Sequence, residues 1–167
     1  MTTEDAIQSF WEDARLRAKV NRVPGYLGVN AREALAPPAW SFGAGPEDAD
    51  ALLALVLAGT KTATSSAQRD FVATGEREPE EGDLSIITDG RGRPRALIQT
   101  TSVRTVPFGE VDAAHAAAEG EGDLSLGHWR DVHRRFFERS AQRAPVTDDL
   151  PIVLERFSVL YAADSAD

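Results

Sequence analysis

Apolar positions recur at helical spacing in two segments of the first sixty residues. One face of a helix predicted over 3–20 carries Ile7, Phe10, Trp11 and Ala14. The text PEDADALLALVLAG predicts a second helix over about 47–58, which ends at Gly59. Residues 21–46 are rich in proline and glycine, so they predict a loop region with one short strand at 40–42.

A change to β-branched residues marks the middle of the chain as a sheet. The segments 84–88 and 95–106 predict two strands, and the Asp-Gly pair between them is typical of a hairpin turn. Residues 152–161, after Pro151, predict a closing strand. We expect these strands to pair antiparallel in one small curved sheet or barrel.

Two helices are predicted between the hairpin and the last strand, at about 109–119 and 124–140. The second carries an aromatic stripe, and we expect Trp129, Phe136 and Phe137 to be buried packing residues rather than a base-stacking surface. The whole pattern predicts an α+β domain, a small antiparallel β-barrel flanked by helices, with an N-terminal helical extension.

The composition narrows the class of protein without naming a function. The chain has 167 residues, 42% hydrophobic and 27% charged, as expected for one folded domain. It has no cysteine, which excludes disulfide and thiolate chemistry. It has neither a span-length apolar run nor a signal-peptide pattern, so we expect a cytoplasmic protein without a membrane partner. The net charge of −9 gives the chain no global electrostatic attraction to nucleic acid.

Lysine is scarce, and one lysine lies in a suggestive setting. Of 18 basic residues only Lys19 and Lys61 are lysines. Lysine can lose its proton when buried, whereas arginine effectively cannot. Thr64 follows Lys61 by three residues after a helix end, and an amine beside a hydroxyl can act as a base and a nucleophile. The alternative is a polar helix end followed by a threonine-rich strand.

The text AEGEGDLS places three acids around two glycines. Glu119 closes a predicted helix, where the dipole disfavours its charge, which predicts a raised pKa and a role in proton transfer. The alternative for Glu119 is a solvated loop residue. Glu121 and Asp123 fit a solvated loop, and Asp123 or Ser125 caps the next helix. The EF-hand pattern is absent.

The histidines and arginines offer weaker candidates. His128 and His133 do not share zinc-ligand spacing, so no metal and no cofactor are expected. His133 falls on the aromatic stripe and predicts a packed, hydrogen-bonded side chain. The ligand-binding candidates combine an aromatic ring, a hydroxyl and basic groups, with solvated surface positions as the alternative: Trp40, Ser66, Arg93 and Arg130.

These motifs together resemble the ASCH domain family, a branch of the PUA-like β-barrel fold. The resemblance rests on AGTKTAT, EEGDLSIITDGRGRPRALIQTTSV, PFGEVDAAHAAAEGEGDLSLGHWRDVHRRFF and LERFSVLY, in that order. It implies a PUA-like barrel over 40–161, preceded by an extension over 1–39 and followed by a tail over 162–167.

The family is associated with RNA, and some small members are amidohydrolases of N4-acylated cytidine. They use a Lys, a Thr three residues later, and a Glu a few residues after a His-Ala pair, which match Lys61, Thr64 and Glu119 here. Longer relatives with the EGEGD segment include a reported ribonuclease. This chain departs from the small amidohydrolases in its N-terminal extension, in Ser66 where they tend to carry Arg, and in the helix after Glu119.

Two function classes follow from the resemblance. The first is a hydrolase, either a ribonuclease or an amidohydrolase, with Lys61 as base, Thr64 as nucleophile or water-positioning hydroxyl, and Glu119 as proton carrier. The second is a module that binds RNA or a modified nucleotide without turnover. The sequence does not distinguish a monomer from a homodimer.

Overall fold

The computed structural model describes residues 1–20, 35–140 and 144–164. The part of the predicted loop region over 21–34 lies outside these residues. The elements, in chain order, are α1 (Thr3–Arg17), β1 (Ala39–Trp40), α2 (Pro46–Leu57), β2 (Ala63–Ala67), α3 (Gln68–Thr74), β3 (Leu84–Thr88), β4 (Pro94–Pro107), a 3₁₀ turn (Phe108–Glu110), α4 (Ala113–Glu119), α5 (Leu126–Arg139) and β5 (Pro151–Ala162). The α+β class is confirmed.

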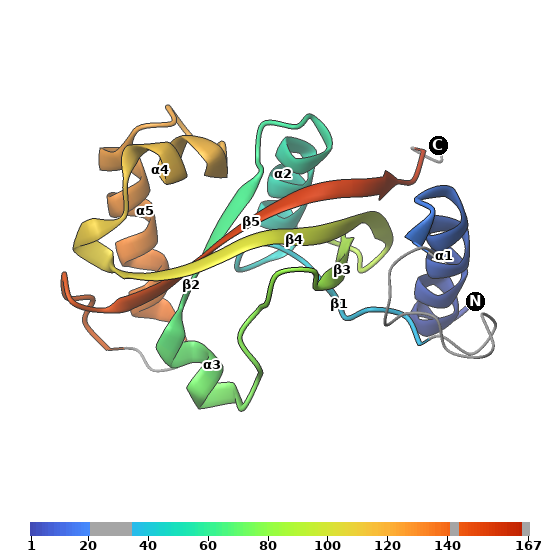
Figure 1. Ribbon diagram of the computed structural model, residues 1–167, viewed down its shortest axis with the longest axis horizontal. Coiled ribbons are helices and arrows are strands. Elements are labelled where there is room, and N and C mark those ends of the chain that lie inside the picture. Colours follow the sequence, from blue (N-terminus) through green and yellow to red (C-terminus); the bar gives the residue numbers. More distant parts are fainter. Residues whose placement is uncertain (21–34, 141–143, 165–167) are drawn as a thin grey trace. The chain divides into compact units, whose positions relative to one another are not determined.

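The strands form a five-stranded mixed sheet in the order β1-β3-β4-β5-β2. The predicted antiparallel pairing is confirmed for β3 with β4, and β2 also pairs antiparallel with β5. Figure 1 shows β4 and β5 running in opposite directions. Two details differ from the expected antiparallel barrel: β1 pairs parallel with β3, and the sheet formed by the described residues is not closed.

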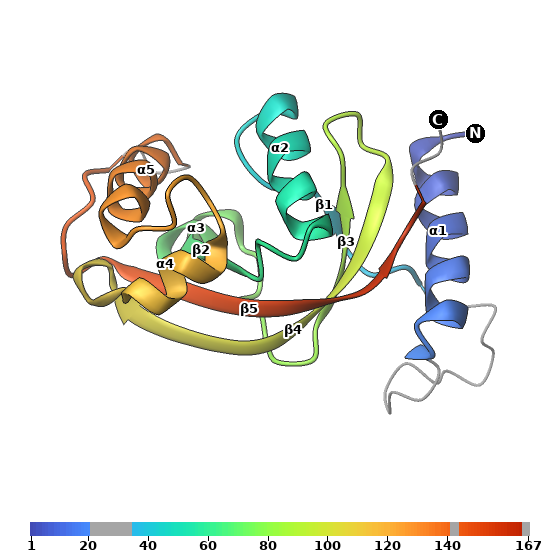
Figure 2. The same ribbon diagram turned by 90° about the horizontal axis from the view of Figure 1, so that it is seen from above.

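The chain divides into two compact units. The first comprises residues 1–57, 84–99 and 159–167. Its core joins Phe10 and Trp11 of α1 to Leu84 of β3 and Leu97 of β4. Phe10 also packs on Tyr161 near the end of β5, where Figure 2 shows α1. Helix α1 therefore contributes to the core of this unit.

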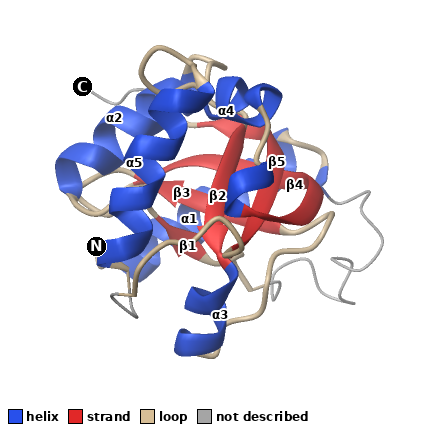
Figure 3. Ribbon diagram, turned by 90° about the vertical axis from the view of Figure 1, so that its left-hand side faces the viewer, coloured by secondary structure: helices blue, strands red, loops and turns tan. Residues whose placement is uncertain are grey.

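The second unit comprises residues 58–83 and 100–158 and carries the candidate site. Its core is built from Ala67 of β2, Ile152 and Leu154 of β5, and Trp129 and Phe137 of α5, with Ala116 of α4. Figure 3 shows α4 and α5 next to β2 and β5 in this unit. The two helices thus bring their polar groups close to β2.

Several local predictions need correction. The helix predicted over 109–119 is interrupted, because the Asp112 side chain accepts from the backbone N–H of His115 and starts a separate helix, α4. Helix α3 follows β2 directly and was missed, since it has no buried residue and so no apolar stripe. Trp129 and Phe137 are buried as expected, but Phe136 is 41% exposed. No helix in the described residues is long and apolar enough to cross a membrane.

Candidate functional site

The site begins where the chain before β2 meets the end of α4. The backbone N–H of Thr62 donates to Ala118 O at 2.7 Å, and Thr62 Oγ1 donates to the same oxygen at 3.3 Å. Gly120 ends α4 with φ +73°, and a Cβ there would overlap the carbonyl of Thr60. A glycine is needed here both for the left-handed backbone and for the close approach.

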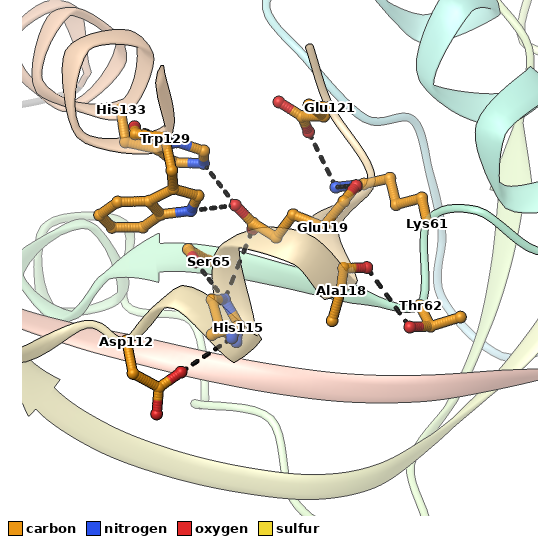
Figure 4. A network of polar contacts seen from close by, with 10 residues as sticks. All are labelled: Lys61, Thr62, Ser65, Asp112, His115, Ala118, Glu119, Glu121, Trp129 and His133. Carbon is orange, nitrogen blue, oxygen red and sulfur yellow. Dashed lines mark hydrogen bonds and ion pairs between the residues drawn. The ribbon is translucent and has the colours of Figure 1, made fainter. Parts of the chain in front are cut away.

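Lys61 lies at this junction, and it is buried, with 2% of its surface exposed. Its Nζ donates to Glu121 Oε1 at 2.9 Å and to the backbone carbonyl of Glu119 at 3.4 Å (Figure 4). The Glu121 side chain is 21% exposed. The expectation that Glu121 belongs to a solvated loop is therefore wrong: the glycines of AEGEGDLS turn the chain so that Glu121 meets Lys61.

The carboxylate of Glu119 is held by two side chains of α5. Trp129 Nε1 donates to Glu119 Oε2, and His133 Nε2 lies 2.9 Å from the same oxygen. His133 Nδ1 lies 2.9 Å from the carbonyl of Trp129, and the two rings stack with centroids 4.2 Å apart. The prediction of a packed, hydrogen-bonded His133 is confirmed, whereas the polar role of Trp129 was missed.

His115 connects α4 to β2. Its Nε2 lies 2.8 Å from Ser65 Oγ and 3.7 Å from Glu119 Oε1 (Figure 4). Since the serine and the acid approach the same nitrogen, the three residues do not have the relay geometry of a Ser-His-acid triad. Within the described residues, the buried Glu119 Oε1 has no hydrogen-bond partner.

The pKa of Glu119 is shifted in the direction opposite to our expectation. Burial by itself would raise this pKa, because it disfavours the charged form. The close approach of His115 and His133, together with the charges of His133 and Lys61, outweighs burial and holds the pKa of Glu119 well below its usual value. Glu119 is therefore an ionised anchor of this network and a poor proton donor near neutral pH.

Thr64 lies on the other face of β2. Successive side chains in a strand point to opposite faces, so Ser65 faces His115 while Thr64 and Ser66 point the other way. Thr64 is directly opposite Glu155 in the register of β2 with β5. The structure thus brings Lys61 to the backbone of Glu119, and it places Thr64 on the face away from the Glu119 network.

The four predicted ligand-binding residues are distributed over both units. Ser66 shares the Thr64 face, and Arg130 Nη2 donates to the carbonyl of Gly109 at 3.2 Å. In the first unit, Trp40 packs edge-on against Phe42, and Arg93 pairs with Asp89 at 2.8 Å at the hairpin tip. These contacts explain their local positions and do not test a ligand-binding role.

Two residue spacings in the sequence agree with the network around Glu119. His115 and Glu119 are four residues apart on α4, and Trp129 and His133 are four apart on α5, so each pair shares one helix face. The contact between the helices was not readable from spacing. In the described parts of the chain, no cluster of three His, Asp or Glu side chains could hold a metal ion.

Comparisons with known proteins identify the family and similar solved structures. The family model for the ASCH domain matches residues 38–161. The crystal structure of an ASCH domain from Lactobacillus crispatus JV V101 is similar with a TM-score of 0.72 and 31% identity, over 90% of this chain and 95% of that chain. A protein from Enterococcus faecalis V583 gives a TM-score of 0.76 and 30% identity, over 93% and 88% respectively. Among curated proteins, none matches this sequence.

Proposed function

This chain belongs to the ASCH domain family, and we propose that it hydrolyses RNA or a nucleoside-like molecule at the Lys61–Glu121 pair. The observation that carries the proposal is a lysine that is 2% exposed and bonded at 2.9 Å to a carboxylate that is 21% exposed. Burying an ammonium group costs several kcal/mol, on the order of the whole stability of some domains, unless it is well paired. The pair places an acid and a base side by side, with one of them partly exposed.

The pair supplies an acid and a base for one hydrolytic step. The Glu121 carboxylate takes a proton from the attacking water, whose oxygen bonds to the acyl carbon or to the phosphorus. The bond to the leaving amine or alkoxide breaks, and that group takes a proton from the Lys61 ammonium. Because Nζ and Oε1 are 2.9 Å apart, the proton then returns from Glu121 to Lys61 and restores the ion pair.

Glu119 and Thr64 have different parts in this proposal. Glu119 acts as a positioning residue, since its backbone carbonyl accepts from Lys61 and its carboxylate ties α4 to α5. Thr64 contacts the substrate from the second face of β2, three residues after Lys61 and therefore at most about 10 Å further along the chain. The hydroxyl of Thr64 is thus assigned to substrate binding rather than to attack.

A second candidate function is binding of RNA or a modified nucleotide without turnover. It is favoured by one observation: the charge of Lys61 is already paired with Glu121. A paired, buried cation can anchor a ligand electrostatically without ever releasing its proton. The same residues would then determine affinity only.

Turnover and affinity measured together separate the two functions. Wild type, Glu121→Gln and Glu138→Gln are assayed on acylated nucleosides and on short RNAs. Glu138 is an exposed carboxylate of α5 and serves as the matched control. We expect wild type and Glu138→Gln to turn over one substrate class and Glu121→Gln to lose at least about 100-fold in rate, the lower limit of acid–base catalysis. Ligand binding without turnover in wild type supports the binding module instead.

A further inference from the structure

The second face of β2 carries a polar group that the proposed reaction does not use. Glu155 of β5 is directly opposite Thr64, and directly opposed residues have Cβ atoms about 4.5–5.5 Å apart. Thr100 of β4 donates from Oγ1 to Glu155 Oε1 at 2.6 Å. Ser66 lies on the same face, two residues after Thr64. A carboxyl group and three hydroxyls thus gather on three neighbouring strands.

Apolar side chains flank Glu155 along its own strand. Val153 and Phe157 flank it on the same face, and both are buried. Burial, together with the nearby charge of Asp83, raises the pKa of Glu155 although the Thr100 hydroxyl opposes the shift. Asp83 itself is bonded to Arg77, with both contacts at 3.1 Å.

The polar groups on this face determine which chemical groups of a ligand can bind there. A carboxylate at Glu155 repels a phosphate group. A carboxylate oxygen accepts from N–H groups, and a threonine hydroxyl can both donate and accept. An exocyclic amine on the edge of a nucleobase offers the donor that a glutamate accepts, as in protein contacts to cytosine.

We propose that Glu155 and Thr64 determine base specificity by accepting and orienting an exocyclic amine of a neutral nucleobase. This inference rests on the proposed function, because it assumes that the ligand is RNA or a nucleoside. Thr100 fixes the Glu155 carboxyl through Oε1, which leaves Oε2 as the oxygen that meets the amine. Thr64 holds the same base from the opposing strand.

Two pairs of nucleosides test the proposal, since each pair differs at one group. Cytidine and adenosine carry an exocyclic amine where uridine and inosine carry a carbonyl. Wild type should bind the amine member of each pair about tenfold more tightly. Glu155→Gln keeps an oxygen for Thr100 but offers an amide N–H to the ligand, so its preference should disappear or reverse. Glu138→Gln should keep the wild-type preference.

The outcomes separate this inference from the proposed function. If Glu155→Gln does not fold, as checked by circular dichroism, Thr64→Val is used and should reduce the preference by at least threefold. An unchanged preference in a folded Glu155→Gln, or no preference in wild type, overturns the inference even if hydrolysis at Lys61–Glu121 is observed. A preference that depends on Glu155 supports it even if no substrate is hydrolysed. Wild type that binds no nucleoside overturns it as well.

Discussion

Lys61 and Glu121, sixty positions apart in the sequence, are joined by a 2.9 Å ion pair at the end of α4. The lysine is almost fully buried and the glutamate is partly exposed. Breaking the pair is therefore expected to destabilise the fold as well as to affect the proposed chemistry. Removing either partner leaves the other charge poorly solvated.

Glu121→Gln should lower the free energy of unfolding by on the order of 2 kcal/mol, below the 3–5 kcal/mol of a fully buried pair because Glu121 is partly exposed. Urea denaturation monitored by tryptophan fluorescence measures the change. Glu138→Gln should stay within about 0.5 kcal/mol of wild type, as exposed substitutions usually do. Equal stability of the two variants would mean that the pair does not contribute to folding.

Gly120→Ala should destabilise the chain more than Gly75→Ala. Both glycines follow a helix with nearly equal backbone angles, φ +73° and +71°. Alanine at Gly75 meets no atom within 4 Å, so it costs only the left-handed strain of about 1–2 kcal/mol. Alanine at Gly120 also overlaps the Thr60 backbone, so a larger loss is expected. Thermal unfolding of both variants gives the comparison, and equal losses would contradict the close approach.

The acid stability of the fold should depend on Glu119. The pKa of Glu119 is lower in the folded chain than its usual value of 4.5. The ionised carboxylate therefore stabilises the folded state above pH 4.5, and this contribution is lost as the pH falls through the folded value. The stability difference between wild type and Glu119→Gln should be present at pH 6 and shrink below about pH 4. A difference that grows toward low pH would contradict the depressed pKa.

Two adjacent phenylalanines on α5 should respond differently to truncation. Phe137 is fully buried in the core of the second unit, whereas Phe136 is 41% exposed. Phe137→Ala should cost about 3–5 kcal/mol, and Phe136→Ala should cost less than about 1 kcal/mol. Chemical denaturation measures both losses. Similar losses would contradict this difference and support the sequence-based prediction that both rings are packing residues.

The sequence predicts the regular elements because their signals are local. The alternating strands over 84–88 and 95–106 and the helices ended by Gly59 and Gly120 carry these signals within a few residues. Helix α3 lacks such a signal because none of its residues is buried. The parallel pairing of β1 depends on two residues that contact β3 from a distant part of the chain, so no local pattern specifies it.

Only part of the candidate site can be predicted from the sequence, because its contacts join distant parts of the chain. The rarity of lysine points to Lys61, but its partner depends on how Gly120 turns the chain after α4. The helix-end argument for Glu119 gave the wrong direction for its pKa, because His133 comes from another helix. The face of Thr64 follows from strand alternation once β2 is known to begin at Ala63.

The central claim is that Lys61 releases a proton during hydrolysis, and the turnover rate of Lys61→Arg at saturating substrate tests it most directly. Arginine keeps the positive charge beside Glu121 but effectively cannot give up a proton. We predict that Lys61→Arg binds substrate within about tenfold of wild type and loses at least about 100-fold in turnover. Turnover equal to that of wild type would contradict proton transfer by Lys61 and remove the pair from the reaction.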